Sequence, residues 1–206
     1  MITLKESILS RSSHGGGRFK TMTMIENWLK EYNIENYNIN YDLTIDVEEN
    51  IKFLNKNITK FPDYIQFGEV KGNFDCSNNN LISLKGCPKY VDGFFNCSYN
   101  KLTSLEGAPK EVGVDFFCHY NKLTSLEGAP KEVGGTFYCF NNKLTSLEGA
   151  PERIGGDFDC SSNQLTSLEG APKEVGGDFE CRRNEVQFIR KDIKKICNVK
   201  GVVRIK

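Results

Sequence analysis

The chain has 206 residues, and its 27 Lys and Arg residues are balanced by 27 Asp and Glu residues. This balance gives no overall attraction to nucleic acid or to an anionic membrane surface. No run of eighteen apolar residues marks a membrane span, and the first 20 residues lack the apolar core of a signal peptide. We therefore expect a soluble, cytoplasmic protein that binds neither nucleic acid nor membranes.

The N-terminal quarter of the chain predicts a flexible segment followed by a cap. Residues 1–20 end in a Ser- and Gly-rich stretch without hydrophobic pattern, which is typical of a linker. Residues 21–49 begin with one apolar helical face and continue as two short strands around a turn near residues 41–42. The helical face consists of Ile25, Trp28, Leu29 and Tyr32. We expect this cap to cover the apolar end of the repeats that follow, with Trp28 in the core.

Six similar units with a period of 21 residues run from Asn73 to about Ile196. Each contains Phe-x-Cys between polar neighbours, which predicts a short strand buried on one face. An Asn three residues after the Cys suits a sharp bend. Leu-Thr-Ser-Leu then turns the chain back, and Gly-Ala-Pro predicts a return by loop or a turn of 3₁₀ helix. The Phe positions are Phe74, Phe95, Phe116, Phe137, Phe158 and Phe179.

Stacked coils can enclose a core that one coil cannot, so this period predicts a solenoid. Residues 51–62 look like a degenerate first coil, with Ile51 and Phe53 at the strand positions and Lys56 where an Asn is expected. Six cysteines recur every 21 residues, unlike the paired cysteines of zinc sites. We expect reduced, buried thiols and no cofactor.

The pattern F-x-C-x-x-N-x-L-T-x-L resembles the leucine-rich repeat, with Phe and Cys at two of the usual Leu positions. The 21-residue period and the Pro-containing return resemble its short bacterial class. The opening "MITLKESIL" and the cap also resemble segments of bacteriophage proteins. The resemblance implies an α/β solenoid over residues 50–189, a leucine-rich repeat horseshoe of parallel strands with short loop or 3₁₀ returns, whose outward strand positions line the concave face. It also implies a protein-binding scaffold.

The C-terminal residues 190–206 predict a second cap. Apolar residues recur at helical spacing at Val186, Ile189, Ile193 and Ile196, and Gly-Ala-Pro is lost. We expect a short amphipathic helix and then a terminal strand over residues 202–205. The basic cluster of Arg190, Lys191, Lys194 and Lys195 is interpreted as a solvated face rather than a nucleic-acid contact.

Function is expected where the units differ from one another. The return path is nearly identical in every unit, so it cannot fit one irregular partner, whereas the outward positions beside the strand vary. Exposed aromatic residues gather there in the middle units, followed by carboxylates and an arginine, as in an interface with a polar rim. The candidate partner-binding residues are Phe94, Tyr99, Phe117, His119, Tyr120, Tyr138, Phe140, Asp157, Asp159, Asp178, Glu180 and Arg182.

We therefore expect a non-catalytic protein-binding module, monomeric, with self-association left open. The phage resemblance extends this to a target in a host cytoplasm. Alternatives are a virion or assembly component, a carbohydrate-binding module, and an N-terminal segment that merely covers Phe94 and Phe117. The neighbouring carboxylates could bind a divalent cation or support catalysis. However, no base–nucleophile pair accompanies them, and His119 has only Asp115 beside it.

Overall fold

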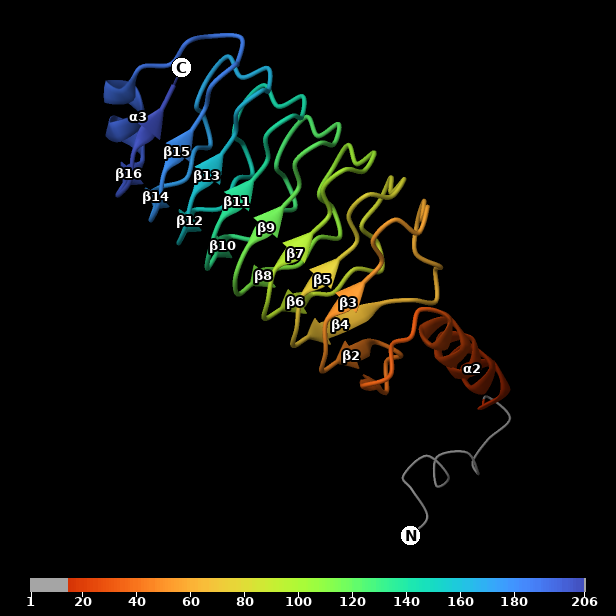
Figure 1. Cartoon of the computed structure of the whole chain (residues 1–206). Helices are drawn as coiled ribbons and strands as arrows, with labels where there is room; N and C mark the ends of the chain where they lie inside the picture. The colour runs from red at the N-terminus through yellow and green to blue at the C-terminus, as the bar shows by residue number, and fades with distance from the viewer. Residues whose placement is uncertain (1–14, 206) are drawn as a thin grey trace.

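The computed structural model describes residues 15–205, which form a solenoid of two sheets with a helix at each end (Figure 1). The helices are α2 (Gly15–Glu31) and α3 (Arg190–Ile196). Sheet A contains β1 (Tyr37–Ile39), β2 (Ile45–Val47), β4 (Phe67–Val70), β6 (Tyr90–Val91), β8 (Glu111–Val112), β10 (Glu132–Val133), β12 (Arg153–Ile154), β14 (Glu174–Val175) and β16 (Asn198–Val199). Sheet B contains β3 (Ile51–Lys52), β5 (Phe74–Asp75), β7 (Phe95–Asn96), β9 (Phe116–Phe117), β11 (Phe137–Tyr138), β13 (Phe158–Asp159), β15 (Phe179–Glu180) and β17 (Val203–Arg204).

Each coil contributes one strand to each sheet, whereas the sequence indicates a strand only at Phe-x-Cys and a loop or 3₁₀ turn on the return. Sheet B is the predicted Phe-x-Cys sheet, and its parallel register pairs Phe116 with Phe137 in the next coil. Sheet A comes from the Glu-Val dipeptides before the glycines, where Val133 pairs with Val112. Within residues 15–205, helix is confined to the two ends of the stack. The fold is therefore a β-solenoid whose coils are joined by turns, rather than the α/β solenoid that the sequence predicts.

The core is filled by the side chains that the period places inward. Phe116 and Phe137 are fully buried, and their ring centroids lie 5.1 Å apart with nearly parallel planes. Leu123 and Leu126 close the same coil from the return side and are also fully buried. The eight cysteines are free and buried, which confirms that prediction. Apolar burial of this kind, repeated in each coil, is the main source of stability in a stack.

The N-terminal cap covers the first coil as expected, but its helix is longer than predicted, because it begins before residue 21. Trp28 packs against Phe53 and Phe61, with ring centroids 5.4 and 6.1 Å away, which confirms its place in the core. Strands β1 and β2 pair antiparallel around the predicted turn. Helix α2 begins at Gly15, so residues 15–20 are helical, and the linker predicted there is wrong. Residues 1–14, the rest of that predicted segment, lie outside the described residues.

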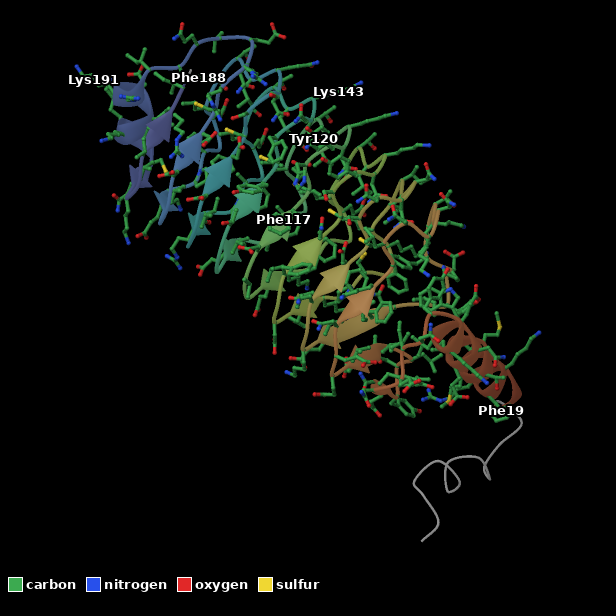
Figure 2. The ribbon with its side chains drawn as sticks, in the orientation of Figure 1. Phe19, Phe117, Tyr120, Lys143, Phe188 and Lys191 are labelled. Atoms are coloured by element: carbon green, nitrogen blue, oxygen red, sulfur yellow. The ribbon has the colours of Figure 1, made fainter. Side chains whose placement is uncertain are left out.

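The C-terminal cap contains the predicted helix and terminal strand, but its apolar residues are arranged differently. Of the four apolar positions only Ile193 is buried, whereas Val186, Ile189 and Ile196 are 40–51% exposed. A helix of seven residues presents only about one position per turn to the stack. Phe188 packs partly against the core beside it; Figure 2 labels Phe188 and Lys191 at this end. No helix within residues 15–205 is long and apolar enough to cross a membrane.

Candidate functional site

The predicted site residues lie on the outward side of sheet B and on the bends that follow its strands. Strand pairing places Phe117 beside Tyr138, then Asp159, then Glu180, in one row across four coils. These side chains point outward because the Phe before each of them is buried and successive strand residues alternate. We call the seven ring-bearing residues of coils two to four the aromatic surface: Phe94, Tyr99, Phe117, His119, Tyr120, Tyr138 and Phe140.

The rings of the aromatic surface form one connected cluster. His119 stacks on Phe140 with centroids 4.4 Å apart, and Phe117 contacts Tyr138 at 5.6 Å. Tyr99 stacks on Tyr120, also at 4.4 Å. Stacked and edge-to-face pairs at these distances stabilise the arrangement of the rings. The rings therefore form an ordered surface, and Figure 2 shows Phe117 and Tyr120 on the middle coils.

Tyr99 and Tyr120 have an unfavourable backbone conformation. Their φ angles are +53° and +52°, in the left-handed region that disfavours bulky side chains. The bend imposes this conformation in every coil, since Asn78, Asn141, Ser162 and Arg183 at the equivalent position are also left-handed. Asn tolerates this region far better than Tyr. Both tyrosine side chains are more than 40% exposed. Strained, exposed aromatic residues are typical of functional surfaces rather than of packing.

His119 lies half-buried in this cluster and is uncharged near neutral pH. Burial lowers the pKa of its imidazole to about 4. Its Nδ1 atom is buried without a hydrogen-bond partner among the described residues. A shallow hollow of about 390 Å³ lies between these rings and polar residues of the first two coils; it is lined by Ser77, Asn78, Asn96, Ser98, Tyr99, Phe117, His119, Tyr138 and Phe140. Asp115, the one carboxylate that the sequence places near His119, is engaged elsewhere: its Oδ1 accepts a hydrogen bond from the backbone N–H of Thr136.

Two of the predicted carboxylates bind backbone groups of the next coil. Asp157 Oδ1 accepts a hydrogen bond of 2.7 Å from the backbone N–H of Asp178. Asp178 Oδ1 in turn accepts one from the backbone N–H of Val202, and Asp178 also pairs with Arg204. These contacts lower the pKa of Asp178, first through the hydrogen bond from Val202. Asp157 and Asp178 therefore help to join the coils.

Asp159 and Glu180 differ in their charge partners. Glu180 forms ion pairs with Arg182 at 2.6 Å and with Arg204 at 3.0 Å. Asp159 Oδ1 accepts a hydrogen bond of 2.8 Å from the backbone N–H of Ser161, but within residues 15–205 its carboxylate has no ion pair. Burial raises the pKa of Asp159, and the charge of Glu180 adds to the effect. Asp159 is thus a partly desolvated anion next to an aromatic ring.

Arg204 is the functional candidate that sequence reasoning missed. It lies beside Glu180 in sheet B, because Phe179 pairs with Val203. That step spans 24 residues instead of 21, so a strict period does not reach it. Exposed Arg182, by contrast, lies where the period predicts, directly against Glu180.

The residues that the structure describes offer no evident metal or nucleophile site. No group of three or more His, Cys, Asp or Glu side chains within residues 15–205 could bind a metal ion. Burial raises the pKa of the Cys118 and Cys139 thiols well above the usual value, so they remain protonated. The cysteines therefore act as core residues.

A larger hollow, of about 1010 Å³, lies on sheet A, which sequence reasoning did not anticipate. Its lining repeats from coil to coil: Lys110 and Lys131 are equivalent, as are Glu111 and Glu132. Arg153 pairs with Glu132 across it. Because it repeats, this face is poorly suited to one irregular partner. We place the candidate site on the aromatic surface.

No protein-family model, no curated protein and no solved structure matches this chain.

Proposed function

We propose that this protein is a non-catalytic binding module whose aromatic surface binds a protein partner. In this proposal the solenoid is a variant of the leucine-rich repeat scaffold. Its coils present the side chains of the aromatic surface to the partner. The phage-like character of its N-terminal residues makes a host protein the expected target. The neutral His119 and protonated thiols support a role in binding rather than in catalysis.

The observation that carries the proposal is the position of the aromatic residues. They break the repeat only in the middle coils. The equivalent outward residues of the other coils are small or polar, such as Asp75 and Ser161. Central aromatic clusters with polar surroundings dominate the energetics of protein interfaces. Two of the rings also occupy the left-handed bend position, where Asn, the residue at 78 and 141, is the less strained choice. Packing within this chain gains little from such exposed rings.

The test is a capture experiment with a variant that the repeat itself supplies. Phe117→Asn, Tyr138→Asn and Phe140→Ser replace each ring by the residue that fills its position in the second coil. We expect this triple variant to fold, because the second coil carries the same residues, and to lose a partner that the unaltered protein captures from host lysate. The matched control is Tyr90→Ala with Val114→Ala, which removes exposed apolar side chains elsewhere on the chain.

The outcomes separate the proposal from its alternatives. A partner lost by the aromatic variant and kept by the control supports it, and a partner kept by both contradicts it. Aromatic rings beside carboxylates also suit carbohydrate, so a glycan array with the same two variants tests that alternative. Detection of the protein in purified phage particles would instead favour a virion component.

A further inference from the structure

The aromatic surface is bordered on one side by negative charge. Moving along sheet B from Phe117, the row continues with Tyr138 and then with Asp159 on the adjacent strand. Burial raises the pKa of the Tyr138 phenol, and the nearby carboxylates of Asp157, Asp159, Glu180 and Asp115 add to the effect in that order. The ring thus lies in a negative field.

Of the carboxylates near this ring, Glu180 is compensated by ion pairs, whereas Asp159 has none among residues 15–205. Asp157 and Asp115 also lack an ion pair there, but each accepts a hydrogen bond from a backbone N–H of the next coil. Glu180 and Asp178 share Arg204, and Glu180 also has Arg182. The hydrogen bond from Ser161 occupies one oxygen of Asp159 without supplying a positive charge. His119, which also lines the hollow, is neutral near pH 7 because its pKa is about 4. A cation that reached this place would meet an unpaired, partly desolvated carboxylate.

A cation site needs a second group beside the Asp159 carboxylate, and the aromatic rings supply it. A Lys or Arg side chain binds favourably over the face of an aromatic ring, especially where water is partly excluded. Tyr138 and Phe140 contact each other edge to face at 5.7 Å, and both line the hollow of about 390 Å³. Because neighbouring strands lie about 5 Å apart, one guanidinium could contact the Tyr138 ring and the Asp159 carboxylate together.

We propose that the Tyr138 ring and the Asp159 carboxylate, adjacent on neighbouring strands of sheet B, together receive a cationic side chain, Arg or Lys, from the protein partner. The proposal rests on the proposed function and adds the chemistry of the partner: a segment that presents a basic residue among apolar ones. The fit is by charge complementarity, since an acidic or purely apolar segment would leave Asp159 unpaired and more deeply desolvated.

The test uses small probes instead of an unidentified partner. The full chain is titrated with an acetylated and amidated Gly-Arg-Gly peptide and, separately, with Gly-citrulline-Gly, whose side chain has the same shape without the charge. The signals of Tyr138 and Phe140 are followed by NMR. We expect the Arg peptide to bind about fivefold more tightly than the citrulline peptide, with the difference shrinking at high salt.

Two matched variants locate the charge. Asp159→Asn keeps the hydrogen bond from Ser161, because Asn96 Oδ1 accepts the equivalent bond of 3.0 Å from the backbone N–H of Ser98. Asp75→Asn is the control. Asp75 lies in the first coil, three strands away from Tyr138, and it accepts the equivalent hydrogen bond from the backbone N–H of Ser77. We expect the fivefold preference to disappear in Asp159→Asn and to persist in Asp75→Asn.

Three results would overturn the cation site: equal binding of the two peptides, an undiminished preference in Asp159→Asn, or no shift with either peptide at tens of millimolar. Each would leave the aromatic surface to be judged by the capture experiment. Loss of capture in the aromatic triple variant together with equal peptide binding would mean that the partner is held by apolar contact alone.

Discussion

One Asn side chain in each coil joins that coil to the previous one. The amide of Asn142 donates hydrogen bonds to the carbonyls of Cys118 and Cys139, and its Oδ1 accepts one of 3.0 Å from the backbone N–H of Leu123. The bend after each strand leaves these backbone groups without sheet partners, and the buried amide satisfies them. Asn100 and Asn163 bind the previous coil in the same way, through Cys76 and Leu81 and through Cys139 and Leu144. A residue that looked in the sequence like a local turn former therefore acts between coils.

Replacement of Asn142 by Ala should consequently cost far more than the loss of a turn residue. The N–H of Leu123 and two carbonyls would remain buried without partners, and we expect the free energy of unfolding to fall by about 3 kcal/mol. Urea denaturation followed by circular dichroism measures this. Lys143→Ala, an exposed change in the same coil, should alter it by less than about 0.5 kcal/mol. Similar effects of the two substitutions would contradict the bridging role.

At the scale of the element, sheet B could be predicted from the sequence and sheet A could not. Phe158 and Cys160 alternate with polar residues, and the 21-residue period fixes which strands are neighbours. Strand β10 has only Glu132 and Val133, too few residues to show a period, and its partners lie in other coils. The same limits apply to the site. The outward rows follow from the period, but Arg204 enters through the longer last coil.

Sheet A also explains the glycines that follow its strands. A Cβ atom on Gly134 would lie 2.0 Å from the carbonyl oxygen of Gly113. A Cβ atom on Gly155 would lie 2.0 Å from the carbonyl oxygen of Gly134. Neighbouring coils approach each other here at backbone distance, so a side chain would force them apart. These glycines are required by packing between coils.

Gly134→Ala should therefore destabilise the protein by about 2–3 kcal/mol, because the added methyl group meets rigid backbone. Gly17→Ala is the same chemical change in helix α2, where a Cβ would have nothing within 4 Å. That change should stabilise the protein by about 0.5–1 kcal/mol, since Ala favours the helix. Thermal unfolding of both variants measures the contrast, and a neutral Gly134→Ala would show that the coils can separate without cost.

At the scale of the whole molecule, the stack is a one-dimensional array. Each coil from β5 onward pairs mainly with the coil before it and the coil after it. Its two ends differ: the N-terminal end is covered by Trp28 and the β1–β2 hairpin, whereas the C-terminal end has a seven-residue helix with only Ile193 buried. In such arrays stability is lowest at the ends and highest in the middle. The aromatic surface therefore lies on the coils expected to open last.

Amide hydrogen exchange should reveal this gradient. The amides of Cys118 and Cys139, bonded to the following coil at 2.9 Å, should exchange most slowly, and that of Cys181 near the C-terminal end faster. Trp28→Ala removes the ring that packs on Phe53, so it should lower the protection of the Phe53 amide by about a hundredfold or more. Cys139 should lose less, because several coils separate it from the cap. Equal exchange at all these amides, or an equal loss throughout the chain in Trp28→Ala, would instead identify the solenoid as a single all-or-none unit.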